Sequence, residues 1–391
     1  MAEERSRTSQ KAAGPPDPPF VNEVRLSARQ WLAAAGILAV CLALTPTLWK
    51  RGERFETGDD YRIPYALSKD YWLYEWRLER LAPTNTVLVG DSVVWGEYVL
   101  PTGTLSHFLN AQSGHPGAFV NAGVNGLFPL ALEGLMRWYG DPVRHGKVLV
   151  HCNLLWMSSP KADLQTDKEE RFNHADLVPQ FSPRIPCYKA NLEHRLAVLV
   201  ERHFTFSQWA THLQNACFEQ KDIPHWTLDD GGGDSPQYPN AYKNPLAQIT
   251  LTVPSEPAVD PERGPKSPRH KPWSTTGKGT THFEWVELNR SLQWSAFQRV
   301  VELLQSRGND VLVVVGPFNE HIMADENRTV FRQLRDGVCA WLESHHVAFV
   351  APETLPSQLY ADASHPVTEG YELLARRLHE DAAFRKWNNG R

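Results

Sequence analysis

The sequence lacks most of the features that mark metal-binding, nucleic-acid-binding and disulfide-rich proteins. Its five cysteines include no C-x-x-C pair, and its 16 histidines include no H-E-x-x-H or comparable ligand spacing. We therefore expect no metal and no cofactor. Long basic runs are also absent, and 40 basic against 45 acidic residues leave a net charge of -5. We therefore expect no nucleic-acid partner.

The few cysteines leave two possibilities open. Cys187 and Cys217 both fall in a loop-rich middle region, where they could pair if that region meets an oxidising compartment. Alternatively, all five cysteines are separate reduced thiols.

Charge is missing altogether from residues 31–49, "WLAAAGILAVCLALTPTLW", which begin and end with tryptophan and are flanked by basic residues on both sides. This length is close to the ~20 residues that cross a hydrocarbon core, and tryptophan is typical of the membrane interface. A cleavable signal peptide and a buried soluble helix are the alternatives. The long polar leader and the lack of an A-x-A-like site favour an uncleaved membrane anchor.

The anchor divides the chain into three predicted parts. Residues 1–30 are polar and proline-containing, which predicts a disordered tail. Residues 31–49 form the anchor, and residues 50–391 form the large domain. The flanking basic residues do not decide the orientation. Because a short inner tail with a large outer domain is the common arrangement, we expect a single-pass protein with an extracytoplasmic (periplasmic) domain.

Within residues 50–391, short β-branched runs alternate with helical patterns. Strands are predicted at 86–90, 118–123, 147–152, 310–317 and 347–352, and helices at 71–81, 127–140, 191–204, 285–307, 327–344 and 368–381. This alternation predicts an α/β fold with a parallel sheet that is covered on both faces. Residues 158–277 are rich in proline, glycine and polar residues, which indicates a loop-rich insertion.

A possible reaction centre begins where the first strand ends, in "TVLVGDSVVWG". Ser92 follows this strand directly, where it is either a nucleophile or the cap of a helix. A serine nucleophile needs a base and a group that orients the base. Asp362 and His365 lie in the loop before the last helix. Because reactive groups gather at the carboxyl edge of a parallel sheet, we expect His365 to act as the base of Ser92 and Asp362 to orient it.

Acyl chemistry also needs donors for the oxyanion. The candidates are the backbone N–H groups of Ser92 and Gly126 and the amide of Asn153. Gly126 could instead serve only a turn, and Asn153 only a loop. In "GPFNEHIM", Asn319 and His321 are possible substrate contacts or parts of an ordinary polar loop.

These blocks, in this order, resemble the SGNH (GDSL-type) hydrolase superfamily over residues 84–156 and 296–380: "GDS" at 90–92, then Gly126, then Asn153, then "DASH" at 362–365. The resemblance implies a flavodoxin-like three-layer αβα sandwich around a central parallel sheet. It also implies the nucleophile, base and oxyanion roles given above.

The chain departs from the family pattern in two places. "VVWG" follows the serine, and "HCNLLW" lacks the usual Gly-x-Asn-Asp form. These features resemble membrane-attached acyltransferases that modify extracellular polysaccharide, such as the alginate O-acetylation proteins. We expect a serine esterase or O-acyltransferase that acts through an acyl-enzyme. Its substrate would be an acylated or acetylated glycan, or another ester-bearing small molecule, at the cell envelope, with an envelope protein as possible acyl donor. The alternative is a catalytically inactive SGNH-like glycan-binding or scaffold protein.

Overall fold

The computed structural model describes residues 26–55, 58–228, 243–253, 271–276 and 279–390. The chain divides into two compact units, Met1–Thr45 and Pro46–Arg391. Residues 1–25 of the predicted disordered tail lie outside the described residues. So do residues 229–242, 254–270 and 277 of the predicted insertion.

Five parallel strands form one sheet in the order β2-β1-β3-β4-β5. The strands are β1 (Thr86–Gly90), β2 (Phe119–Gly123), β3 (Lys147–Cys152), β4 (Asp310–Val315) and β5 (Ala348–Val350). The predicted α/β class with a parallel sheet is thus confirmed. The strand order reverses between β1 and β3, and in such sheets ligands bind outside the carboxyl ends of the strands at this switch point.

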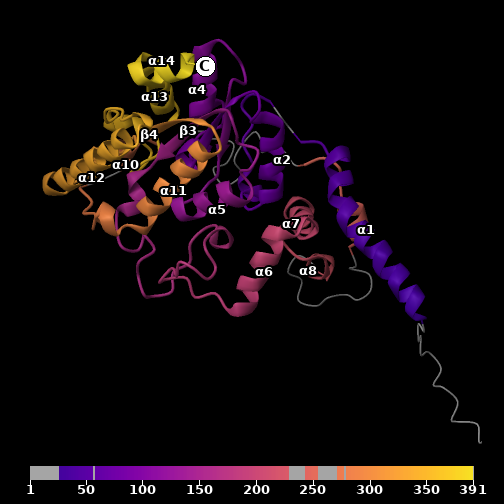
Figure 1. Ribbon diagram of the computed structural model, residues 1–391. Helices are drawn as coiled ribbons and strands as arrows, with labels where there is room; N and C mark the ends of the chain where they lie inside the picture. The colour runs from indigo at the N-terminus through magenta and orange to yellow at the C-terminus, as the bar shows by residue number, and fades with distance from the viewer. Residues whose placement is uncertain (1–25, 56–57, 229–242, 254–270, 277–278, 391) are drawn as a thin grey trace, which may run out of the picture. The chain divides into compact units, whose positions relative to one another are not determined.

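Most strand residues are apolar, as expected for a sheet that is covered on both faces. Val89 and Val150 enter one hydrophobic cluster, together with residues of α2, α5, α11 and α12. Their neighbours Leu88 and Leu149 enter a second cluster with α4, α13 and α14. Figure 1 shows α5 and α11 on one side of the strands and α4, α13 and α14 on the other.

The helices have the following bounds: α1 Ala28–Gly52, α2 Tyr71–Leu81, α3 Ser92–Trp95, α4 Leu105–Ser113, α5 Pro129–Trp138, α6 Leu192–His203, α7 Thr205–Cys217, α8 Ile223–Leu228, α9 Pro245–Gln248, α10 Trp273–Thr276, α11 Leu292–Ser306, α12 Asp325–Ser344, α13 Thr368–Glu380 and α14 Ala382–Asn389. The helix start predicted at Ser92 corresponds to α3, whereas α4, α7, α8, α9, α10 and α14 were not predicted.

Helix α11 begins later than residue 285, where the sequence pattern placed its start. Ser291 caps it by accepting a hydrogen bond from the N–H of Trp294 at 2.9 Å. The carboxylate of Asp163 accepts from the N–H groups of Leu292 and Gln293 at 2.9 and 3.0 Å. Asp163 belongs to the insertion, so local sequence could not reveal this cap.

Helix α1 contains the predicted anchor segment 31–49. It is 25 residues long and apolar enough to cross a membrane. Its large apolar side chains, such as Leu38, are exposed. The Thr45 hydroxyl donates a hydrogen bond to the carbonyl oxygen of Cys41 at 2.7 Å, a contact typical of hydroxyl side chains in apolar helices.

The insertion contains more helix than predicted, and α7 packs on α2. The rings of Trp209 and Trp49 lie 5.6 Å apart in an edge-on arrangement. Cys187 and Cys217, whose pairing the sequence left open, are both free.

Candidate active site

The end of β1 is shaped so that Ser92 stands at the carboxyl edge of the sheet. A side chain at Gly90 would lie 2.5 Å from Val94 and 2.9 Å from His151, so the close approach of these elements requires glycine. Asp91 then caps α3 by accepting from the N–H of Val93 at 3.0 Å. Ser92 is therefore the first residue of a short helix, and it is only half-buried.

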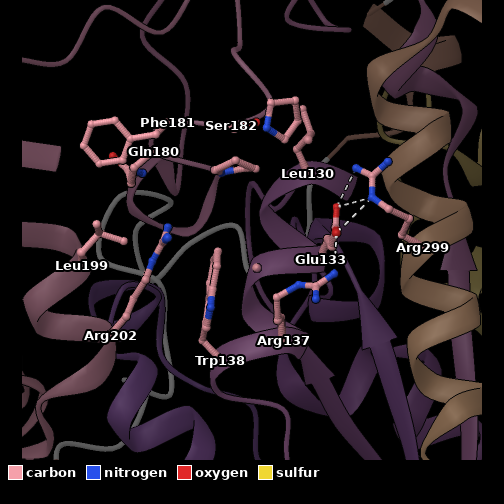
Figure 2. A pocket seen from close by; sticks show the side chains of 13 residues that line it. Leu130, Glu133, Arg137, Trp138, Gln180, Phe181, Ser182, Leu199, Arg202 and Arg299 are labelled. Carbon is pink, nitrogen blue, oxygen red and sulfur yellow. Dashed lines mark hydrogen bonds and ion pairs between the residues drawn. The ribbon is translucent and has the colours of Figure 1, made fainter. Parts of the chain in front are cut away.

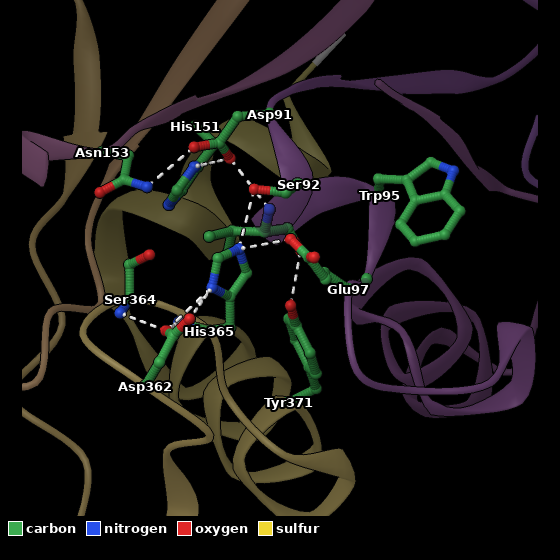
Figure 3. Close-up of polar contacts among 12 residues, drawn as sticks. Asp91, Ser92, Trp95, Glu97, His151, Asn153, Asp362, Ser364, His365 and Tyr371 are labelled. Carbon is green, nitrogen blue, oxygen red and sulfur yellow. Dashed lines mark hydrogen bonds and ion pairs between the residues drawn. The ribbon is translucent and has the colours of Figure 1, made fainter. Parts of the chain in front are cut away.

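Ser92, His365 and Asp362 form a continuous chain of hydrogen bonds (Figure 3). His365 Nε2 lies 2.8 Å from Ser92 Oγ, although the two residues are 273 positions apart. Its other ring nitrogen, Nδ1, lies 2.8 Å from Asp362 Oδ2. The same carboxylate accepts from the backbone N–H groups of Ser364 and His365 at 2.9 Å, which fixes the loop. The sequence predicted this set of three, and the structure brings its members together.

The charges around His365 favour its protonated form. Burial opposes protonation, but the hydrogen bond and charge of Asp362, together with the charges of Glu97 and Asp91, outweigh it and raise the pKa of His365. Burial likewise acts to raise the pKa of Asp362, yet its bonds to His365 and to the loop N–H groups hold that pKa below its ordinary value. Asp362 therefore stays ionised and stabilises an imidazolium on His365.

A second histidine–carboxylate pair lies directly behind the nucleophile, and sequence analysis missed it. His151 Nδ1 lies 3.0 Å from Asp91 Oδ1, and both side chains are almost fully buried. Asn153 donates to the other oxygen of Asp91 at 2.8 Å. Burial acts to raise the pKa of Asp91, but His151 and Asn153 outweigh it and lower that pKa. The polar histidine within the apolar strand "KVLVHC" was the signal available.

The three predicted oxyanion donors occupy different positions. Ser92 begins α3, where backbone N–H groups have no acceptor within the helix. Asn153 uses one amide hydrogen on Asp91, which leaves its second hydrogen for another acceptor. Gly126 has a φ of +71°, and a side chain there would lie 2.2 Å from Asn173 Nδ2. The turn therefore requires glycine, and the oxyanion role of Gly126 stays a prediction.

The two predicted substrate contacts are already bonded to the protein. Asn319 is fully buried and donates to the carbonyl oxygen of Asp362 at 3.0 Å. His321 Nε2 lies 2.9 Å from the carbonyl oxygen of Leu355. Asn319 thus holds the loop that carries Asp362. A substrate contact for either residue stays a prediction without support from this geometry.

Two residues that follow α3 also reach His365, and neither was predicted. Glu97 Oε2 lies 3.5 Å from His365 Nε2, the nitrogen that faces Ser92. Tyr98 places its ring edge-on to His365, with 5.3 Å between ring centres. Gly96 and Tyr98 both have positive φ angles, of 90° and 68°, and this turn directs the two side chains back to the imidazole.

A cavity of about 430 Å³ lies beside Tyr98, and its lining also includes Val367 and Lys271. Another, of about 510 Å³, lies between α5, α6 and α11 (Figure 2). In the second cavity Arg137 and Arg299 are paired with Glu133. Arg202 there stacks on Trp138 at 3.6 Å. The lining of this larger cavity contains no paired nucleophile and base, so the chemistry points to Ser92 instead.

Among the residues that the structure describes, no group of three or more His, Cys, Asp or Glu side chains could hold a metal ion. No model of a known protein family matches the sequence, and no curated protein matches it.

Proposed function

We propose that this protein is a serine esterase or O-acyltransferase of the SGNH (GDSL) type. The observation that carries the proposal is the distance of 2.8 Å between Ser92 Oγ and His365 Nε2, with Asp362 at 2.8 Å on the opposite side of the ring. This is the geometry in which a hydroxyl loses its proton to an imidazole that a carboxylate orients.

The reaction follows from these contacts. His365 takes the Ser92 proton as Oγ attacks the ester carbonyl carbon, and the electron pair of the C=O bond moves to the oxygen. The tetrahedral intermediate collapses, its C–O bond to the alcohol breaks, and His365 returns the proton to the departing alkoxide. Water or a second hydroxyl then attacks the acyl-enzyme by the same route in reverse. The N–H of Ser92 and the free amide hydrogen of Asn153 are the donors offered to the oxyanion.

The architecture supports the family resemblance. We propose a flavodoxin-like three-layer αβα sandwich, because the strand order 2-1-3-4-5 is the flavodoxin order. Two separate hydrophobic clusters on alternate strand residues support the layering. Ser92 and Asn153 follow the neighbouring strands β1 and β3, at the switch point where such folds bind ligands.

The substrate we propose is an acylated or acetylated glycan, or another ester, at the cell envelope, and an envelope protein is a possible acyl donor. The 430 Å³ cavity beside Tyr98 supports a bound acceptor, because its lining combines an aromatic ring, the apolar Val367 and the polar Gln358. Helix α1 would anchor the protein in the membrane with the catalytic unit on the extracytoplasmic side.

One observation favours a second candidate, a catalytically silent glycan-binding or scaffold protein. Asn153 is bonded to Asp91 and is followed by Leu154 instead of the family's acidic residue. Ser92, His365 and Asp362 argue against it, because a silent site has no physical need for all three in hydrogen-bond contact.

Hydrolysis of p-nitrophenyl acetate, with and without an oligosaccharide acceptor, tests the proposal. We expect acetate release that depends on Ser92, and acyl transfer in excess of hydrolysis would identify a transferase. No turnover of either kind by well-folded protein, with p-nitrophenyl acetate and longer acyl esters alike, would favour the silent candidate.

A further inference from the structure

Exposed apolar side chains are concentrated on the insertion. Among the described residues outside the insertion and α1, Tyr65 and Val330 are the only large apolar side chains that are exposed. Within the insertion they recur on α6, α8 and the segment near residue 250. Soluble proteins rarely expose several large apolar side chains together, so we expect a partner to cover those of the insertion.

The most regular group is the α6 apolar face, formed by Leu192, Leu196, Val200 and Phe204. Their exposed fractions are 62, 48, 56 and 44%. A spacing of four residues places Leu192, Leu196 and Val200 in one row along the helix, and Phe204 follows directly after the helix, where the backbone is extended. The opposite side of α6 buries Val198. The helix therefore packs one side on the protein, through Val198 and Arg202, and leaves an apolar side exposed.

An unbroken series of aromatic rings leads from this face to the end of the anchor helix. Phe204 and Phe206 lie 6.1 Å apart, and Phe206 and Trp209 lie 5.1 Å apart. Trp209 in turn lies 5.6 Å from Trp49, the last residue of the uncharged segment. Tryptophan side chains such as Trp209 and Trp49 are typical of the membrane–water interface.

Another exposed apolar side chain, that of Leu251, lies next to the C-terminal end of α1. The N–H of Arg54 donates to the carbonyl oxygen of Leu251 at 2.9 Å, and the N–H of Val253 donates back to Arg54 at 2.8 Å. Leu251 is 49% exposed. Its side chain lies beside Gly52, where an added Cβ would be 3.8 Å away. The insertion is thus fastened to the residues at which a membrane-spanning α1 would leave the bilayer.

We propose that the α6 apolar face lies in the lipid bilayer interface, next to the point where α1 emerges. The partner is lipid acyl chain and glycerol, because the face is continuous with the anchor through Phe206 and Trp209. The inference rests on α1 being the membrane anchor of the proposed function, and it does not depend on acyl chemistry. It gives the insertion a role: the catalytic unit is held to the membrane at two places.

Lipid quenching on the full chain tests this inference. A cysteine carrying an environment-sensitive NBD dye is placed at Leu196, with Val200 as a second position, in a Cys41→Ser, Cys339→Ser background in which the three remaining native cysteines are buried. The labelled chains are reconstituted into phosphatidylcholine–phosphatidylglycerol vesicles with or without brominated acyl chains. Leu38→Cys on α1 is the positive control. Val330→Cys, an exposed apolar position on α12, is the matched negative control.

We expect bromolipid to quench the dye at 196, 200 and 38 by at least twofold and to leave 330 unchanged. Quenching at 38 without quenching at 196 or 200 overturns the inference while the anchor stands. Absence of quenching at 38 as well overturns the anchor and this inference together, and leaves the acyl chemistry of Ser92 to its own assay. A dye at 196 that is shielded from water but not quenched indicates a second copy or a protein partner, and also overturns the inference.

Discussion

Two histidines in this chain each have a carboxylate on Nδ1, and they differ in the partner of Nε2. His365 has Asp362 on Nδ1 and the hydroxyl of Ser92 on Nε2. His212 has Asp70 on Nδ1 at 2.7 Å and Glu53 on Nε2 at 3.0 Å, and it is completely buried. The difference is the partner of the second ring nitrogen. His365 Nε2 faces a hydroxyl at 2.8 Å, with the partly exposed Glu97 farther away at 3.5 Å, whereas His212 Nε2 faces a buried carboxylate at 3.0 Å.

The charges follow from this difference. Burial opposes protonation of His212, but Asp70 and Glu53 outweigh it and raise its pKa to about 10. His212 is therefore protonated at neutral pH and ties α7 of the insertion to Glu53 after α1 and to Asp70 at the start of α2. His365 also has a raised pKa, yet it keeps one nitrogen facing a group that can react. The proposed catalytic site and the buried His212 cluster thus use the same residue types.

Ser92→Ala should have the largest effect on activity. We expect esterase kcat/KM to fall by about 10⁴-fold or more, because the nucleophile is lost. Thermal unfolding in detergent should stay unchanged, because Ser92 is half-buried and its side chain bonds to His365 alone among the described residues. A variant that keeps its activity would remove Ser92 from the mechanism.

Asp362→Asn should cost about 10³–10⁴-fold in kcat, because the amide cannot stabilise the imidazolium and can favour the wrong tautomer. It should also move the acid limb of the kcat/KM profile to lower pH. His365 must be neutral to act as the base, and Asp362 is a main reason why its pKa is raised. A limb that stays in place would show that His365 is not the group that titrates.

His212→Asn should instead reduce stability, by about 3–5 kcal/mol, because Glu53 and Asp70 would remain buried without their cation. Activity per folded molecule should be retained. His225→Ala is the control, since it removes a histidine–carboxylate pair that is exposed, with 81% of the His225 side chain accessible. That control should leave the unfolding midpoint unchanged, and an equal loss in both variants would contradict the account.

The same cluster predicts a pH dependence of stability. The folded pKa of His212, about 10, lies above its unfolded value of about 6.5. Its stabilisation is therefore fully present below pH 6.5, declines as the pH rises, and is lost above pH 10. The difference in unfolding free energy between wild type and His212→Asn should shrink between pH 7 and pH 10. A constant difference would mean that His212 is not the fixed cation.

Asn153→Ala should lower kcat by about 10²–10³-fold if its second amide hydrogen meets the oxyanion. Asn153→Asp is the companion variant. Like Asn153→Ala it removes both amide hydrogens, and in addition it places a carboxylate beside Asp91. We expect both to lose activity, and Asn153→Ala to lose about 1–3 kcal/mol of stability as well, because Asp91 and the N–H of Leu155 lose a buried partner. Full activity in Asn153→Ala would limit Asn153 to positioning Asp91.

The smallest effect should come from Glu97→Gln. Glu97 helps to raise the pKa of His365 from 3.5 Å, but it is partly exposed and does not orient the ring. We expect the acid limb of kcat/KM to move to lower pH with a change of no more than about threefold in the plateau rate. A loss as large as that of Asp362→Asn would show that Glu97 has a catalytic part of its own.

The sequence predicts both the parallel sheet and the grouping of Ser92, His365 and Asp362, and the physical reason is the same for both. Buried parallel strands are short β-branched runs, so "TVLVG" and "KVLVHC" give β1 and β3 to the residue. The carboxyl ends of such strands share one edge, which is why Ser92 and His365 could be paired across 273 positions.

What the sequence could not predict depends on contacts between distant segments. The start of α11 is fixed in part by Asp163 from the insertion, and the contacts of His151 and Glu97 arise only when β1, β3 and the last loop come together. A lone histidine on an apolar strand is typical of a buried core, so His151 carried too little signal. The same holds for His212, whose partners lie 142 and 159 positions away.

Covalent labelling of the full chain by a fluorophosphonate, with the adduct located by mass spectrometry, tests the central claim most directly. We predict one adduct on Ser92, absent in Ser92→Ala and strongly slowed in His365→Ala, while His212→Asn is labelled in proportion to its folded fraction. Folded wild-type protein that forms no adduct, or forms it on another residue, would contradict the claim that Ser92 and His365 make a working nucleophile.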